Sequence, residues 1–244
     1  MGIKEVQHGI RRIQLDAPLV KKPSLFKLKC NIYAIKADAG ITLFDCGPME
    51  TVTMLQSALQ AERVTQIFLT HGHSDHAGSA VYWLKEGAKV FAPQDECTLL
   101  ASGGPENAPQ AFRYRGFEPT GILKVDDRIA IDKAFDFVVL RTPGHTSGSV
   151  CYYDERRDIL ISGDLMFGPV WGHMVTFLLE FITSLRQPDA DLQRQIESLE
   201  KLLNSGVIKR NTLILPGHGA TYHMQEKPNA VRRSSGLLRL CLRL

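Results

Sequence analysis

The chain carries Thr70-His71-Gly72-His73-Ser74-Asp75-His76-Ala77-Gly78, which places three imidazoles and one carboxylate within positions 71–76. The apolar run 67–69 before it predicts a short buried strand, and residues 77–86 after it predict a helix. The cluster is therefore expected on a tight strand-to-helix loop, where side chains can converge. Neutral imidazole and carboxylate are ligands for zinc, iron or manganese. Chance histidines in a polar loop are the alternative, but three of the chain's eight His fall here.

Three later segments each place one potential ligand directly after an apolar, strand-like run and beside glycine. They are Thr142-Pro143-Gly144-His145-Thr146-Ser147-Gly148 after residues 137–140, Ile161-Ser162-Gly163-Asp164 after 159–161, and Leu215-Pro216-Gly217-His218-Gly219 after 213–215. Glycine lets the backbone turn sharply and approach its neighbours closely. One pattern repeated four times predicts that His145, Asp164 and His218 share a site with the histidine loop.

The ligand order His-x-His-x-Asp-His, then His, Asp and His, resembles that of the metallo-β-lactamase-fold hydrolases. The flanking ThrProGlyHisThrSerGly, SerGlyAsp and ProGlyHisGly resemble the glyoxalase II (hydroxyacylglutathione hydrolase) branch, and Phe44-Asp45-Cys46-Gly47 matches the family's upstream Asp. The resemblance covers about residues 30–220. It implies an α/β fold, a four-layer αβ/βα sandwich with two mixed β-sheets. The motifs are specific for the superfamily and only weakly specific for the substrate.

The resemblance also implies a dinuclear metal site. One metal would be held by His71, His73 and His145, the second by Asp75, His76 and His218, and both by a bridging Asp164. Two Zn²⁺ per chain are expected, with Fe or Mn as alternatives. Metal binding lowers the pKa of water from about 15.7 to near 7, so a metal-bridging hydroxide can attack a carbonyl without a serine or cysteine nucleophile.

Three carboxylates have expected roles in this site. Asp75 and Asp164 are the expected catalytic residues. Asp45 is expected to orient a ligand histidine from behind, and a turn-forming Asp beside Gly47 is the alternative.

Hydrophobic patterning predicts further elements. Strands are expected at residues 30–36, 41–45 and 89–92, and a hairpin at 149–154 with 158–161. Helices are expected at residues 49–60, 94–101 and 189–204, the last of them strongly amphipathic.

The composition agrees with one enzyme domain, expected over residues 1–230, and a basic, leucine-rich tail, 231–244, that is frayed or introduced by cloning. The net charge is +3, but four arginines and no acid lie in the last sixteen residues, so the remainder is close to neutral. We therefore expect no nucleic-acid partner. No membrane partner is expected either, because the oily stretch 174–185 is interrupted by Glu180 and is too short to span a bilayer.

The cysteines predict the compartment. There are five, at positions 30, 46, 97, 151 and 241, without a Cys-x-x-Cys, which favours reduced thiols in the cytoplasm. Residues 1–5 lack the apolar core of a signal peptide, which agrees with this expectation.

The substrate is expected to be a small molecule with a thioester, ester or lactone carbonyl, and glyoxalase II-like thioester hydrolysis is the leading hypothesis. Most β-lactamases of this fold lack an acid at the position of Asp164, and homoserine-lactone hydrolases usually have Tyr where this chain has Phe167. Residues 165–185 contain no Lys or Arg to clamp an anionic tripeptide. Phe167, Trp171 and His173 are expected to border the substrate pocket, unless the aromatic side chains belong to the core and the histidine to a loop.

Several alternatives stay open. A quorum-quenching type of lactonase and a β-lactamase-like amide hydrolase share the metal chemistry. A mononuclear iron persulfide dioxygenase belongs to another class, and such enzymes use two His and one Asp rather than the full ligand set. A sensor that keeps its metals without turnover is a third class. The oligomeric state is open between a monomer and a homodimer.

Overall fold

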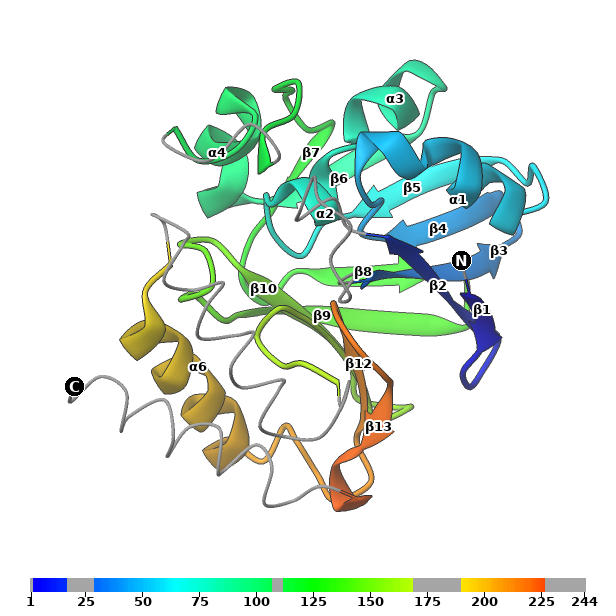
Figure 1. Ribbon diagram of the computed structural model, residues 1–244. Coiled ribbons are helices and arrows are strands. Elements are labelled where there is room, and N and C mark those ends of the chain that lie inside the picture. Colours follow the sequence, from blue (N-terminus) through cyan, green and yellow to red (C-terminus); the bar gives the residue numbers. More distant parts are fainter. Residues whose placement is uncertain (1, 17–28, 107–111, 169–189, 227–244) are drawn as a thin grey trace. The chain divides into compact units, whose positions relative to one another are not determined.

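A computed structural model describes the protein over residues 2–16, 29–106, 112–168 and 190–226. The chain divides into two compact units, Met1–Lys124 and Val125–Leu244, each built around one β-sheet (Figure 1). Both sheets contain parallel and antiparallel pairs, which confirms the predicted α/β class with two mixed sheets. The tail 231–244 lies outside the described residues.

Seven strands form the first sheet in the order in which they occur along the chain. They are β1 (Gly2–Glu5), β2 (Ile10–Asp16), β3 (Lys29–Ala37), β4 (Gly40–Phe44), β5 (Val64–Phe68), β6 (Lys89–Pro93) and β7 (Gly121–Leu123). Strands β1 to β4 pair antiparallel, and β4 to β7 pair in parallel. The strands predicted in this unit are present as β3 to β6. Strand β2 was not predicted because the adjacent Arg11 and Arg12 break its apolar alternation.

The helices of the first unit are shorter than predicted. The helix expected over residues 49–60 is a 3-10 turn, η1 (Met49–Thr51), followed by α1 (Val52–Ala58), and residues 94–101 form η2 (Gln94–Glu96) and α4 (Cys97–Ser102). The helix expected over residues 77–86 is present as α3 (Ala80–Lys85), and part of the histidine cluster, which was expected on a loop, forms a separate short helix, α2 (Ser74–Ala77). The two helices are separate because Ser79 donates from its backbone N to Gly47 O (2.9 Å) and from Oγ to Cys46 O (2.7 Å).

Six strands form the second sheet in the order β13-β12-β11-β10-β9-β8. They are β8 (Arg128–Ile131), β9 (Phe135–Arg141), β10 (Val150–Asp154), β11 (Ile159–Gly163), β12 (Leu213–Pro216) and β13 (Tyr222–His223), and η4 (Met224–Glu226) follows. The predicted hairpin is β10–β11. The predicted amphipathic helix is α6 (Leu192–Asn204), which begins where the Asp191 side chain accepts a hydrogen bond from Arg194 N.

Each unit has its own apolar core. In the first, Leu55 of α1 and Trp83 of α3 pack on the sheet, and in the second, Leu199 and Leu202 of α6 pack with Ile214 of β12. Within the described residues, no helix has the length and apolar character needed to cross a bilayer.

Candidate metal centre

The predicted ligands of the first unit follow the carboxyl ends of two neighbouring strands. Strands β4 and β5 run in parallel, so their ends lie at one edge of the sheet. Asp45 follows β4 directly, and Thr70 and His71 follow β5. Because the ends of neighbouring parallel strands lie side by side, short loops after β4 and β5 suffice to bring these side chains together.

The carboxylate of Asp45 connects the other residues of this cluster through hydrogen bonds. It accepts hydrogen bonds from Thr70 N (2.8 Å) and Thr70 Oγ1 (2.8 Å), and it contacts His76 Nδ1 at 2.7 Å. The side chains are buried, Asp45 at 3% exposure and His76 at 0%. An ionised carboxylate only accepts hydrogen bonds, so His76 must carry its proton on Nδ1 and present a lone pair at Nε2.

The same carboxylate sets the tautomer of His71 through Thr70. The Thr70 hydroxyl has one proton, which it donates to Asp45, and its oxygen lies 3.0 Å from His71 Nδ1. Thr70 Oγ1 can therefore only accept from His71, which puts the His71 proton on Nδ1 and the lone pair on Nε2. Both histidines are thereby prepared to bind a cation through Nε2.

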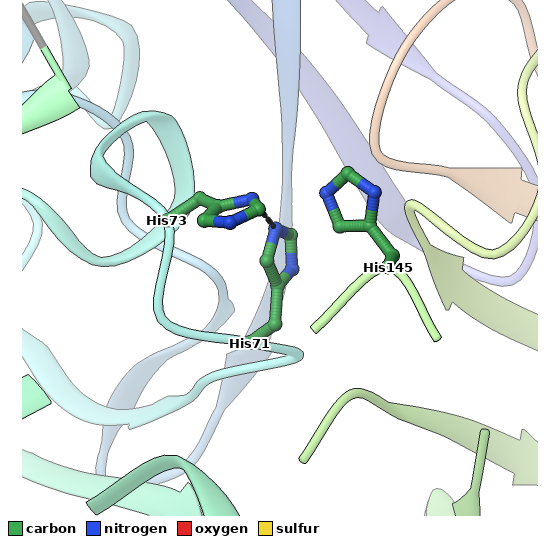
Figure 2. A group of neighbouring side chains, drawn as sticks. All are labelled: His71, His73 and His145. Carbon is green, nitrogen blue, oxygen red and sulfur yellow. Dashed lines mark hydrogen bonds between the residues drawn. The ribbon is translucent and has the colours of Figure 1, made fainter. Parts of the chain in front are cut away.

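His71 and His73 have the spacing of two ligands on one ion. His71 Nε2 and His73 Nδ1 face one another at 3.1 Å, and Figure 2 shows the two rings with this contact. Two nitrogens about 2.0–2.1 Å from one tetrahedral zinc stand roughly 3.3 Å apart, so the pair fits such a site. His73 would bind a metal through Nδ1 as the tautomer that carries its proton on Nε2.

Asp75 and His76 offer a second pair of ligand atoms. Both lie on α2, and Asp75 Oδ2 is 4.0 Å from His76 Nε2, the nitrogen that Asp45 leaves with a lone pair. Cys46 N and Gly47 N both donate to the His76 backbone oxygen, at 2.8 and 3.2 Å. The ring and the backbone of His76 are thus both held by the turn after β4.

The predicted ligands of the second unit also share one edge of a sheet. Strands β9 and β11 are both antiparallel to β10, and β12 is parallel to β11, so β9, β11 and β12 run in the same direction. His145, Asp164 and His218 follow their carboxyl ends. Asp164 Oδ2 lies 3.3 Å from His145 Nε2 and 3.1 Å from His218 Nε2, and all three side chains are buried. One carboxylate oxygen therefore contacts both imidazoles, as a ligand shared by two cations would.

Backbone contacts between glycines fix the loops that carry Asp164 and His218. Gly217 N donates to Gly163 O (2.8 Å), and Gly168 N donates to His218 O (2.8 Å). A Cβ at Gly168 would lie 2.0 Å from Ala220 O, so only glycine permits this approach. The Phe167 ring stacks on His218 with centroids 5.4 Å apart, which places this predicted pocket residue against a predicted ligand.

Helix α6 holds the loops of His145 and Asp164. Ser198 Oγ donates to Pro143 O (2.6 Å), and Gln195 Nε2 donates to Asp164 O (3.1 Å). Gly144 has φ 137°, and a Cβ there would lie 2.1 Å from Gln195 N. The glycine before His145 is therefore required by contact with the helix.

Each unit brings its predicted ligands together, and each contributes His and Asp side chains that can bind a divalent metal. Trp171 and His173 lie outside the described residues. Cys46, which follows Asp45, is fully buried, and this burial raises the pKa of its thiol to about 12, so it is no nucleophile at neutral pH. Sequence reasoning missed Thr70, Glu96, Tyr114 and Gln195, because their contacts join segments that no local pattern relates.

Comparison with known proteins identifies the family. A family model described as the metallo-beta-lactamase superfamily matches residues 25–218. A human relative named acyl-coenzyme A thioesterase MBLAC2 is 28% identical over 180 residues, which are 66% of this chain and 58% of the human protein. A Haemophilus influenzae relative named hydroxyacylglutathione hydrolase GloC is 28% identical over 160 residues, 63% of this chain and 68% of that protein. The solved metallo-beta-lactamase from Pontibacter korlensis has the same fold, with a TM-score of 0.74, 18% identity and 98% of both chains covered.

Proposed function

Because this chain belongs to the metallo-β-lactamase superfamily and is a metal-dependent hydrolase, we propose that it holds two zinc ions and hydrolyses thioesters. The observation that carries the dinuclear part is the contact of Asp164 Oδ2 with both His145 and His218. A carboxylate oxygen that binds two metal ions is expected to lie about this far from another ligand of each ion.

The proposed ligand set is the one that the family resemblance implies. His71, His73 and His145 hold one ion, Asp75, His76 and His218 hold the other, and Asp164 binds both. The family match supports this assignment because it runs to residue 218 and so includes all seven ligands. The set of imidazoles and carboxylates suits zinc, and iron or manganese are the alternatives to be tested.

When bound, two divalent ions lower the pKa of a water from about 15.7 to near 7 and polarise a carbonyl. The chain's own part is to hold and orient. Asp45 fixes the proton of His76 on Nδ1 and, through Thr70, that of His71 on Nδ1. Asp75 and Asp164, the proposed catalytic carboxylates, are 7% and 6% exposed, so water screens their interaction with a bound cation only weakly.

The thioester is proposed from the named activities of two relatives, an acyl-coenzyme A thioesterase and a hydroxyacylglutathione hydrolase. The Phe167 ring stacked on His218 makes this part of the site apolar, which suits an acyl group. Lactone and β-lactam hydrolysis use the same metal chemistry and are the competing outcomes of the test.

The test is a panel of substrates on metal-analysed protein. Purified protein is expected to contain about two zinc ions per chain and to cleave an acyl-coenzyme A or acyl-glutathione thioester faster than a homoserine lactone or a β-lactam. His218→Ala is the control, since it should lose one ion and most of the activity. One iron per chain, with oxygen consumption on a persulfide, would instead establish the dioxygenase.

We also propose a cytoplasmic location and a small-molecule substrate. Cys30, Cys46, Cys97 and Cys151 are free thiols, which agrees with a reducing compartment. Fractionation of the native host with antibodies against the protein tests the location.

A further inference from the structure

Gly72 lies between the two ligand histidines His71 and His73, and side chains from a distant segment bind both of its backbone polar atoms. Gly72 N donates to Glu96 Oε2 at 2.6 Å, and Gly72 O accepts from the Tyr114 hydroxyl at 2.6 Å. The loop between the ligands is therefore held from both sides.

Glu96 is an unusual residue for this position because its side chain is 0% exposed. Burying a carboxylate is unfavourable unless hydrogen bonds and positive charge compensate for the lost water. The Gly72 amide supplies one short hydrogen bond, and a cation bound by His71 and His73 would supply positive charge nearby. Glu96 lies directly before α4, 24 positions along the sequence from the Gly72 amide that it accepts a hydrogen bond from.

The absence of a side chain at Gly72 makes these contacts possible. A Cβ there would lie 2.8 Å from Leu99 Cδ2 and 2.9 Å from Glu96 Oε2. The segment formed by η2 and α4 thus packs directly on the backbone between the two ligands.

Tyr114 is fixed to the same segment. Tyr114 N donates to Gly103 O (3.0 Å), and Phe117 N donates to Leu100 O (3.0 Å). Cβ atoms at Gly103 and Gly116 would lie 2.2 Å from Tyr114 O and 2.0 Å from Ala101 O. The chain that carries Tyr114 therefore packs closely on the end of α4, the helix that Glu96 precedes.

We propose that Glu96 and Tyr114 are positioning residues that hold His71 and His73 in the geometry of a metal-ligand pair, and that the charge of Glu96 strengthens cation binding there. This inference rests on the proposed function, since it takes His71 and His73 as ligands of one ion. Partners behind the ligands of a metal typically change its affinity by about 10–100-fold when they are removed. The η2–α4 segment is thus part of the metal site although it supplies no ligand.

Three variants separate position from charge. Glu96→Gln keeps an oxygen that can accept from Gly72 N and removes the charge, Glu96→Ala removes both, and Tyr114→Phe removes only the contact with Gly72 O. Asp95→Asn is the matched control because it removes one charge from the exposed neighbour of Glu96.

Affinity is measured by titrating zinc into the metal-free protein in competition with a chromophoric chelator, and cobalt(II) absorption reports the ligand geometry. We expect the tighter zinc affinity to fall about 10–100-fold in Glu96→Ala and about 3–10-fold in Glu96→Gln and Tyr114→Phe, with an altered cobalt spectrum. The Asp95→Asn protein should match the parent within twofold. The zinc affinity that Glu96→Gln regains relative to Glu96→Ala measures the contribution of the hydrogen bond. The deficit that remains relative to the parent measures the contribution of the charge.

The outcomes distinguish this inference from the proposed function. If His71→Ala leaves the zinc affinity unchanged, the ligand assignment fails. If His71→Ala abolishes binding but Glu96→Gln and Tyr114→Phe both stay within twofold of the parent, the positioning role is overturned and the ligand assignment stands. Should Glu96→Ala fail to fold in the metal-free state, judged by circular dichroism, the Gln and Phe variants decide alone.

Discussion

Replacing Asp45 by Asn should weaken the binding of both proposed metal ions, because one carboxylate oxygen contacts both His76 and Thr70. The amide keeps one oxygen, which can still accept from Thr70 N, but it puts an NH₂ group opposite His76 Nδ1, 2.7 Å from the present oxygen. If His76 keeps its lone pair at Nε2 for the metal, its Nδ1–H faces the new N–H, and two buried donors lose their acceptors. If His76 instead changes tautomer, Nε2 carries a proton and cannot bind.

The magnitude follows from the two unsatisfied donors. Each buried donor without an acceptor costs about 1–3 kcal/mol, so the metal-bound form loses about 2–6 kcal/mol. At about 1.4 kcal/mol per tenfold, the ion at His76 should bind roughly 30-fold to 10⁴-fold more weakly. The ion at His71 should also bind more weakly, because the Thr70 hydroxyl loses the same Asp45 oxygen as its acceptor. It can then donate to His71 Nδ1, which moves the proton of that ring to Nε2.

The contrasting variant is Thr70→Val, which has nearly the same shape and lacks the hydroxyl. It removes the acceptor of His71 Nδ1 and leaves the contact of Asp45 with His76. It should therefore weaken the binding of only the ion at His71. Zinc titration against a chromophoric chelator and elemental analysis after dialysis measure both affinities. Two ions bound by Asp45→Asn within threefold of the parent affinities would refute the tautomer argument.

Three further predictions concern the second unit and the buried thiol. Asp164→Asn should retain its fold but lose an ion and lower hydrolysis by at least about 10²–10³-fold, since charge and ligand are removed together; two retained ions with full turnover would contradict the shared-ligand role. Gly144→Ala should lower the free energy of unfolding by about 1–3 kcal/mol, because φ is 137° and the Cβ would meet Gln195 N; an unchanged urea midpoint would contradict it. Burial raises the pKa of Cys46 to about 12, so about one thiol in 10⁴ should be ionised at pH 8, and Cys46 should react with iodoacetamide only after unfolding. Rapid labelling of Cys46 in the native protein, located by mass spectrometry, would contradict this.

Much of the fold could be predicted because its signals are local. Strands β9, β11 and β12 contain short apolar runs with a glycine at or soon after the end of the strand, and such runs predict buried strands whatever surrounds them. Helix boundaries were less predictable. The helix expected over residues 77–86 begins only at Ala80, because Ser79 forms hydrogen bonds to the turn after β4, and no pattern near residue 79 indicates that partner.

The sequence by itself determined the candidate ligands: an imidazole or carboxylate beside glycine at the end of an apolar run is a local property that four segments display. Only the tertiary structure decided what supports them. Glu96 reaches Gly72 across 24 positions, Tyr114 reaches it across 42, and Gln195 reaches Asp164 across 31. These contacts depend on which segments pack together, and in sequence a buried Glu or Gln looks the same as an exposed one on a helix surface.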